Sequence, residues 1–253
     1  QWTERIDDPA IWARVYDIPD EYLWAVRKHY KRRLASFMQE RARSKWVTHS
    51  QHPVQTIASG VLINPNVLTI GFARRFATYK RASLILRDVK RLLNIINNPY
   101  RPVQILFAGK AHPNDEPGKR LIQELYRQVK NADTAGRLVF IEDYDMYVAR
   151  QLVQGVDVWM NTPRRPYEAS GTSGMKAALN GSLNFSVLDG WWREAYNGKN
   201  GWAIGDERDF ATAEEQDAAD AESLFSTLEN EIVPLYYRTD DCLLYTSPSP
   251  RDS

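Results

Sequence analysis

The sequence predicts an α/β domain with a parallel sheet that is covered by helices on both faces. From residue 67 onward, short apolar runs alternate with amphipathic helical segments. Repeated strand–helix units of this length are typical of parallel sheets. The chain has 253 residues, of which 43% are hydrophobic and 26% are charged, so it is long enough to bury the core of one such domain.

A long helix is predicted ahead of the sheet, over residues 17–45. Pro19 suits the first helical position and Asp20 suits the positive end of the helix dipole, and apolar residues then recur at helical spacing. Residues 46–66 show no clear periodicity, and we expect a loop or linker there.

The strands and helices of the sheet follow in order along the chain. Strands are expected at the largely apolar runs 67–72, 103–108, 138–141 and 156–160, and residues 182–187 are a further candidate strand. Helices are expected at residues 79–96, 117–130, 146–153, 175–179 and 214–237. Because ligands of such sheets bind outside the carboxyl ends of the strands, we expect a site just after residues 72, 108, 141 and 160.

Composition excludes several classes of function. The net charge of +1 gives no overall field that would attract nucleic acid or an anionic membrane. No apolar run approaches the roughly 20 residues of a membrane helix, and the first residues lack the pattern of a signal peptide. The single cysteine, Cys242, excludes an internal disulfide and a thiolate metal cluster. We therefore expect a cytoplasmic protein with no nucleic-acid or membrane partner and no metal.

A cluster of four cations follows the first strand: Arg74, Arg75, Lys80 and Arg81. Positive charge at the carboxyl end of a strand, leading into a helix, suits an oxyanion such as phosphate. Taken alone, such a segment is more often the solvated basic start of a helix. Nucleic acid is a weaker alternative because the rest of the chain supplies no basic face.

A second segment, Glu168-Ala169-Ser170-Gly171-Thr172-Ser173-Gly174-Met175-Lys176, follows the strand expected at 156–160. Its small residues allow backbone N–H groups to converge on an anion, although it matches neither the Walker loop nor the dinucleotide fingerprint. Lys176 falls on the first turn of the helix expected at 175–179. A lone helical lysine is usually solvated, but one beside an anion loop is a candidate for imine formation, since desolvation lowers its pKa. These residues alone predict phosphate chemistry of an undefined type.

The run from Glu168 to Gly181 closely resembles the pyridoxal phosphate signature of the glycogen/α-glucan phosphorylases. Further landmarks of that family occur in the same order: Tyr79-Lys80-Arg81, Ala108-Gly109-Lys110-Ala111-His112-Pro113, Glu142-Asp143-Tyr144 and Val187-Leu188-Asp189-Gly190. The resemblance covers roughly residues 1–238 and is closest to the short bacterial enzymes. It implies a Rossmann-like domain that forms the C-terminal half of a two-domain GT-B glycosyltransferase fold. It also implies phosphorolysis of terminal α-1,4-linked glucose to glucose 1-phosphate with pyridoxal 5'-phosphate as cofactor.

The resemblance also implies roles for individual residues. Lys176 matches the lysine that forms the imine with the cofactor, and Arg75 and Lys80 match the basic pair that binds the substrate phosphate and the cofactor phosphate. The positions that match catalytic residues are Lys176, Arg75 and Lys80. The positions that match cofactor-binding residues are Lys176, Lys80, Gly171, Thr172 and Tyr144. The positions that match substrate-binding residues are Glu168, Ala169, Ser170, Gly171 and Arg75.

By the same resemblance, the chain divides into three parts. Residues 1–66 are expected to be a helical segment and linker that joins a missing N-terminal domain of the same enzyme. Residues 67–238 are the expected cofactor-binding catalytic domain, and residues 239–253 an expected foreign or disordered tail. The implied partners are an α-1,4-glucan, inorganic phosphate and that N-terminal domain, without which we expect no activity. A homo-oligomer is also possible on this sequence.

Two alternatives to a phosphorylase remain at this point. A nucleotide-sugar glucan synthase has the same C-terminal layout but needs no imine lysine, so Lys176 is the discriminating residue. The chain by itself could also be an inactive module that binds glucan or phosphate without turnover.

Overall fold

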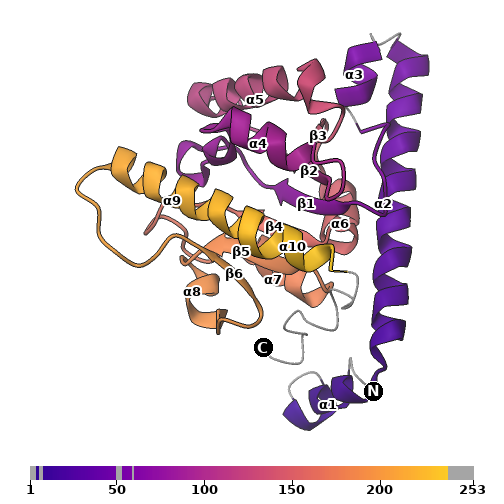
Figure 1. Cartoon of the computed structure of the whole chain (residues 1–253), viewed down its shortest axis with the longest axis vertical. Coiled ribbons are helices and arrows are strands. Elements are labelled where there is room, and N and C mark those ends of the chain that lie inside the picture. Colours follow the sequence, from indigo (N-terminus) through magenta and orange to yellow (C-terminus); the bar gives the residue numbers. More distant parts are fainter. Residues whose placement is uncertain (1–3, 6–7, 50–52, 59, 239–253) are drawn as a thin grey trace.

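The computed structural model describes residues 4–5, 8–49, 53–58 and 60–238. These residues form an α/β domain around a six-stranded sheet in which neighbouring strands run parallel (Figure 1). The strands are β1 (Leu68–Ala73), β2 (Val103–Ala108), β3 (Leu138–Ile141), β4 (Val158–Asn161), β5 (Leu183–Val187) and β6 (Gly201–Ile204). The parallel α/β fold expected from the sequence is confirmed.

The strands lie in the order β3-β2-β1-β4-β5-β6. The chain builds outward from β1 on one side and then returns to β4, which pairs with β1, to build the other side. In doubly wound sheets, ligands bind at this switch point, beyond the carboxyl ends of its two strands. The segments that follow Ala73 and Asn161 therefore lie where a site is expected.

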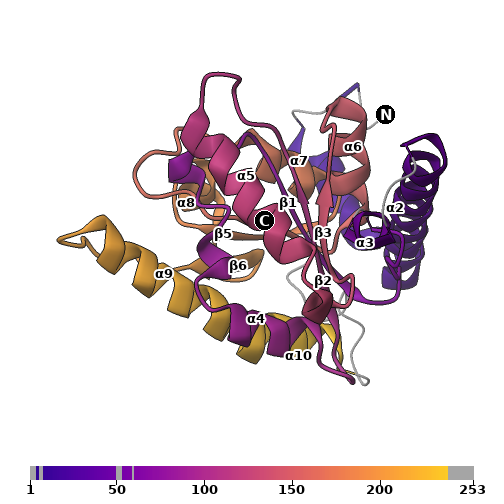
Figure 2. The same cartoon turned by 90° about the horizontal axis from the view of Figure 1, so that it is seen from above.

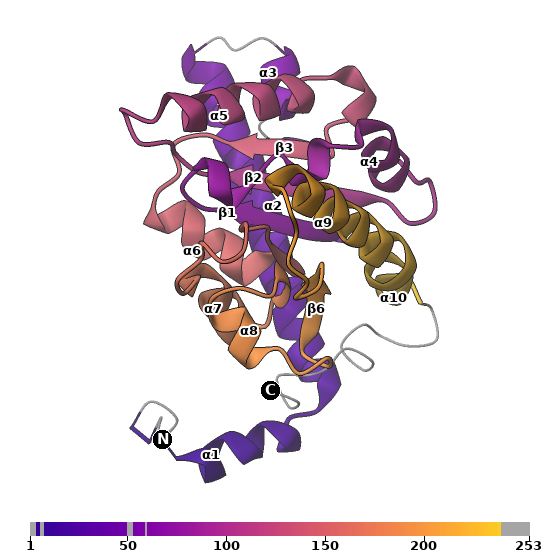
Figure 3. The same ribbon diagram turned by 90° about the vertical axis from the view of Figure 1, so that its left-hand side faces the viewer.

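Helices cover both faces of the sheet. The α-helices are α1 (Pro9–Ala13), α2 (Asp20–His49), α3 (Pro53–Ala58), α4 (Val89–Ile96), α5 (Glu116–Val129), α6 (Met146–Gly155), α7 (Thr172–Leu179), α8 (Trp191–Ala195), α9 (Ala213–Thr227) and α10 (Val233–Tyr236). Helices α2, α6 and α7 share one apolar core with the sheet, and α4, α5 and α9 share the other (Figure 2). Successive residues of β1 enter opposite cores, as Phe72 and Ala73 do. Helix α1 lies at the end of the molecule opposite α3 and α5 (Figure 3).

Two buried cations fix helix α2 to the segments that lead into β4 and β5. Lys31 Nζ lies 2.6 Å from Asp157 Oδ2 and is almost fully buried. Arg27 donates to the carbonyl oxygens of Gln154 at 2.8 Å and Asn180 at 3.0 Å. Burial lowers the pKa of Lys31, while Asp157 opposes that shift.

No helix in the described part of the chain combines the length and apolar character that a membrane span requires.

The prediction of one continuous helix over residues 79–96 is wrong. The chain makes a 3-10 turn at Thr78–Lys80, reverses at Arg81 with a φ of 46°, and makes a second 3-10 turn at Leu84–Leu86. Helix α4 begins only at Val89. The second 3-10 turn is buried throughout, and its short apolar run, directly ahead of α4, does not by itself distinguish a turn from the start of the helix.

Other boundaries also differ from expectation. The region 46–66 is not all loop, because α2 continues to His49 and α3 follows, with residues 50–52 and 59 outside the described part. Helix α2 begins at Asp20, so Pro19 precedes it instead of opening it. Strand β4 begins later than the expected residue 156, and α8 and β6 were not expected as elements. The tail 239–253 lies outside the described residues, and the division of the chain into parts stays a prediction.

Candidate functional site

A cleft of about 520 Å³ lies at the switch point of the sheet. Every site residue predicted from the sequence lines it: Arg75, Lys80, Tyr144, Glu168, Ala169, Ser170, Gly171, Thr172 and Lys176. Their segments follow β1, precede α6 and lead into α7. Ala149, Val153 and Trp159 add an apolar wall. The fold thus brings together residues that are about a hundred positions apart in the chain, as expected for strand ends that meet at one edge of a sheet.

Three charged side chains meet inside the cleft. Arg74 Nη2 lies 2.5 Å from Glu168 Oε2, and Lys80 Nζ contacts the same carboxylate oxygen. The three side chains are 8%, 9% and 10% exposed for Arg74, Lys80 and Glu168 respectively. Burial lowers the pKa of the Arg74 guanidinium, and Glu168 opposes that shift. Two cations that converge on a single carboxylate leave the cluster with excess positive charge.

Arg74 is the functional candidate that the sequence did not single out. It belongs to the cation cluster seen in the sequence, but the resemblance pointed to Arg75 and Lys80. Arg74 Nε and Nη1 are buried and have no hydrogen-bond partner within the described part of the protein. Buried donors of this kind are rare unless a ligand or water satisfies them. No local signal in the sequence distinguishes Arg74 from its neighbours, because its partner Glu168 is 94 residues away.

Arg75 differs from Arg74 in its surroundings. It is exposed and lines the cleft. Among the residues that the structure describes, it has no ion pair. Its guanidinium is therefore available to an anionic ligand without the displacement of a protein carboxylate, in contrast to Arg74 and Lys80.

Lys176 lies on α7, behind the glycine-rich turn. Gly171 precedes the helix with a φ of 86°, which favours glycine. A Cβ on Gly174 would come within 2.8 Å of both Asn184 Oδ1 and Trp191 Nε1, so this position also requires glycine. Helix α7 begins at Thr172, which places Lys176 on its second turn and corrects the first-turn position expected from the sequence. The Lys176 side chain is exposed and faces the cleft.

A small polar cavity extends behind Glu168. Its lining residues are Arg74, Asn161, Pro163, Glu168, Ser170, Gly171, Ser186, Asp189 and Trp191. Asp189 Oδ2 accepts from the backbone N of Glu168 at 2.9 Å, and Trp191 N donates to Ser170 O at 2.8 Å. These bonds connect the segment 168–171 to the chain after β5. Asp189, which belongs to a landmark seen in the sequence, and Trp191 thus hold the loop that carries Glu168.

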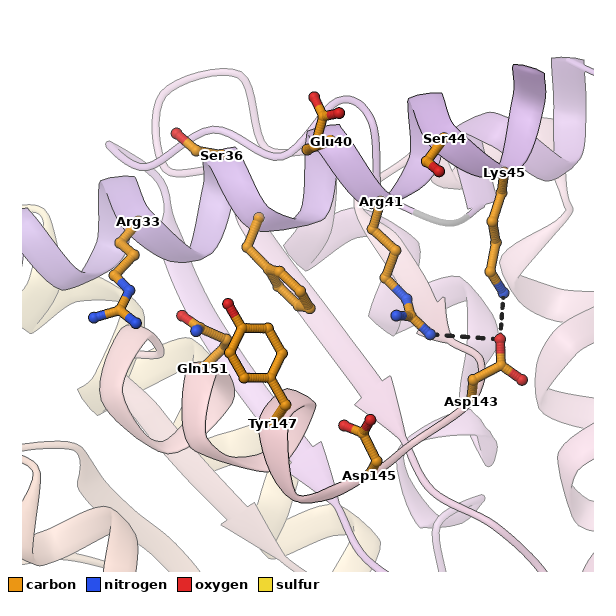
Figure 4. Close-up of a pocket in the computed structure, with 11 residues that line it drawn as sticks. Arg33, Ser36, Glu40, Arg41, Ser44, Lys45, Asp143, Asp145, Tyr147 and Gln151 are labelled. Carbon is orange, nitrogen blue, oxygen red and sulfur yellow. Dashed lines mark hydrogen bonds and ion pairs between the residues drawn. The ribbon is translucent and has the colours of Figure 1, made fainter. Parts of the chain in front are cut away.

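A larger groove of about 820 Å³ lies between α2 and α6 (Figure 4). Helix α6 presents Tyr147 and Gln151 to this groove, whereas Ala149 and Val153 face the cleft. Asp143 pairs with Arg41 at 3.4 Å and with Lys45 at 2.8 Å. The cations that line the groove (Arg33, Arg41 and Lys45) are balanced by three carboxylates (Glu40, Asp143 and Asp145), so the groove is less suited to an anion than the cleft.

Comparison with known proteins gives a consistent result. The family model described as "Carbohydrate phosphorylase" matches residues 22–218. The chain is 49% identical over 240 residues to the glycogen phosphorylase of Aquifex aeolicus, with 95% of this chain and 34% of that protein covered. It is 48% identical over 237 residues to the maltodextrin phosphorylase of Thermococcus litoralis, with 93% and 28% covered. It is 40% identical over 239 residues to the glycogen phosphorylase of Mycobacterium tuberculosis, with 94% and 28% covered. The chain thus spans about a third of the length of the curated relatives it matches.

Proposed function

Because this chain belongs to the carbohydrate phosphorylase family, we propose that it forms the phosphate-handling part of an α-glucan phosphorylase. The reaction would transfer the terminal α-1,4-linked glucose of a glycogen- or maltodextrin-like chain to inorganic phosphate. One phosphate oxygen bonds to the anomeric carbon, the glycosidic bond breaks, and a proton passes to the glycosidic oxygen of the shortened glucan. The products are glucose 1-phosphate and a glucan with one unit fewer.

The observation that carries this proposal is the excess positive charge of the cleft. Arg74, Arg75 and Lys80 all line it, and Glu168 supplies the only carboxylate among its described lining residues. A phosphate dianion requires such compensation, and guanidinium groups bind it through paired hydrogen bonds. Arg74 Nε and Nη1 are buried donors without a hydrogen-bond partner among the described residues, and an anion in the cleft would accept hydrogen bonds from them.

We also propose pyridoxal 5'-phosphate as the cofactor of this cleft. The residues fit the group: Lys176 supplies an amine, the cations suit its phosphate, and Ala149, Val153 and Trp159 offer an apolar wall for a flat ring. The residues that would hold it are Lys176 as the anchor, with Lys80, Gly171, Thr172 and Tyr144. When bound, its phosphate group supplies proton-transfer chemistry next to the substrate phosphate.

The residues of the chain would then divide the remaining tasks. Arg75 and Lys80 offset the repulsion between two neighbouring phosphate groups and stabilise the charge that moves during transfer. Glu168 and the backbone around Ser170 and Gly171 would bind the hydroxyl groups of the glucosyl unit. Holding the sugar and the phosphate in one orientation removes much of the entropic cost of their reaction.

The anchor is tested by reductive trapping. Borohydride treatment of the full-length protein should fix the cofactor on the tryptic peptide that contains Lys176. Lys110 follows β2 and does not line the cleft, so Lys110→Ala is the matched control and should leave the labelling unchanged. Lys176→Ala should lose the covalent label yet keep some noncovalent cofactor, because the anion loop remains. A label on Lys80 or Lys110 would contradict the assignment.

The reaction is tested by incubating the full-length protein with maltodextrin and inorganic phosphate. Release of glucose 1-phosphate that stops when either substrate is omitted supports the proposal. Transfer of glucose from a nucleotide sugar without any phosphorolysis would instead favour the glucan synthase alternative. Binding of both ligands without turnover would favour a non-catalytic binding module.

The chain by itself is expected to be inactive. Because it spans about a third of its relatives' length, we propose that another part of a longer polypeptide closes the cleft over the glucan. An open cleft leaves phosphate hydrated and screens the cations. The 253-residue chain should therefore release negligible glucose 1-phosphate in the same assay. Removing residues 240–253 should not restore activity, and robust turnover by the chain alone would refute the proposed closure.

A further inference from the structure

We infer that Arg81 is a positioning residue for Lys80, an inference that rests on the proposed phosphate-binding function of the cleft. Arg81 does not line the cleft and is 4% exposed. It follows Lys80 directly in the chain and acts on the site through that neighbour. None of the roles implied by the family resemblance falls on it.

The guanidinium of Arg81 connects two segments that are distant in the sequence. Nε donates to Thr162 O at 3.0 Å, and Nη2 donates to Pro163 O at 2.8 Å. Nη1 and Nη2 also donate to Asp217 Oδ1 at 2.8 Å and to Asp220 Oδ2 at 2.6 Å. The first pair belongs to the loop after β4 and the second to α9. A planar fork of donors can hold both at fixed angles, which an ammonium cannot do.

The backbone at Arg81 is equally constrained. Its φ and ψ are both 46°, a left-handed conformation that is unfavourable for a residue with a Cβ. Thr162 Oγ1 donates to the carbonyl oxygens of Lys80 and Arg81, each at 3.0 Å. The reversal separates the two cations: Lys80 contacts Glu168 in the cleft, whereas Arg81 contacts α9. The position of the Lys80 ammonium therefore depends on a turn that the Arg81 guanidinium holds.

The same contacts also bear on Glu168. The loop that Arg81 contacts at Thr162 and Pro163 continues to Glu168, the carboxylate that Lys80 contacts. Loss of the guanidinium would thus loosen both partners of one ion pair relative to each other. Arg91 offers a contrast, since it ties α4 to Glu222 and Glu229 without lining the cleft.

The test uses the full-length protein and the variant Arg81→Gly. Glycine accepts the positive φ without strain, so the variant tests only the loss of the guanidinium and of its bonds to the loop after β4 and to α9. We expect the KM for inorganic phosphate to rise by about 10- to 100-fold, the effect of a small misplacement of a binding group. The KM for maltodextrin should rise by a smaller factor, because the backbone of Glu168 keeps its separate bond to Asp189. Added free guanidinium ion should occupy the vacated space between the four acceptors and lower the phosphate KM again, after correction for its effect on the wild type.

Two variants separate positioning from general stability. Arg91→Ala removes a comparable tie to the helices after β6 and should leave both KM values unchanged. Arg81→Lys keeps the positive charge but lacks the planar set of guanidinium donors. It should raise the KM for phosphate, and added guanidinium ion should not lower that KM again. This variant provides the test if Arg81→Gly fails to fold. An unchanged phosphate KM in the folded variants, or an equal rise in both KM values, would overturn the inference.

Failure of the proposed function would be visible separately. If the wild type releases no glucose 1-phosphate, the proposed reaction is wrong, and calorimetric titration with inorganic phosphate then decides the role of Arg81. Weaker phosphate binding by Arg81→Gly than by the wild type, restored by guanidinium, supports positioning. Equal binding contradicts it.

Discussion

The ion cluster in the cleft predicts an unusual response of stability to phosphate. Glu168 is 10% exposed and compensates Arg74 and Lys80, which are 8% and 9% exposed. Glu168→Gln keeps the shape of the side chain but leaves two buried cations next to each other. Removing one partner of a buried ion pair costs about 3 kcal/mol at the lower end of the measured range. For a cooperative unit the size of this 253-residue chain, that loss lowers the melting temperature by roughly 6–12 °C, and a longer polypeptide that unfolds as one unit shows a smaller shift.

Phosphate should reverse most of this loss in the variant. A phosphate concentration about 100 times Kd adds about 2.7 kcal/mol to the stability of the folded state, which nearly matches the loss. In the wild type, phosphate has to displace the Glu168 carboxylate from the same two cations. The same phosphate concentration should therefore raise the melting temperature of the wild type by fewer degrees than that of Glu168→Gln.

The assay is thermal unfolding of the full-length protein with and without phosphate, at constant ionic strength set by chloride. Glu142→Gln is the matched control, because Glu142 also follows a strand at this edge but pairs with Lys45 and is 39% exposed. It should change stability by less than about 1 kcal/mol and leave the phosphate response unaltered. A Glu168→Gln variant as stable as the wild type without phosphate, or one that phosphate stabilises less, would refute this account of the cluster.

Three further predictions concern other parts of the chain. Arg75→Ala in the full-length protein should reduce the rate of glucose 1-phosphate release by about 100-fold or more, with a larger effect on phosphate dependence than on glucan dependence. An unchanged phosphate dependence would indicate that Arg75 is an ordinary solvated surface residue. Lys31→Met should destabilise the protein by about 3–5 kcal/mol in denaturant titration, because it strands buried Asp157, whereas Lys31→Met combined with Asp157→Leu should recover most of the loss. For Asp217, burial raises the pKa, but hydrogen bonds from arginines outweigh it and hold the pKa below its usual value. Its stabilising contribution is therefore present above the unfolded pKa of about 3.9 and lost as the pH falls through the folded pKa. Asp217→Asn should accordingly show a shallower loss of stability on acidification, and an identical acid profile would contradict the shift.

Much of the fold could be predicted from local sequence patterns. The strands β2 and β3 begin and end where they were expected, since strands buried on both faces leave a nearly continuous hydrophobic run, broken in β2 by Gln104. The segment from Glu168 to Lys176 is also contiguous, so its small residues and its lysine could be read together. The conformation of residues 79–96 could not be predicted in this way, because the short apolar run of a buried 3-10 turn cannot be told locally from the start of a buried helix.

The partners of the charged residues were decided only by the tertiary structure. The pairing of β1 with β4 brings the two cleft loops together, and strand order has no local signature in the sequence. Arg74 meets a carboxylate 94 residues away and Arg81 meets one 139 residues away. The sequence shows that both Lys80 and Arg81 are cations. The backbone reversal at Arg81 decides that Lys80 lies in the cleft and that Arg81 is buried against α9. That reversal persists because distant acceptors satisfy its side chain, and only the folded chain supplies them.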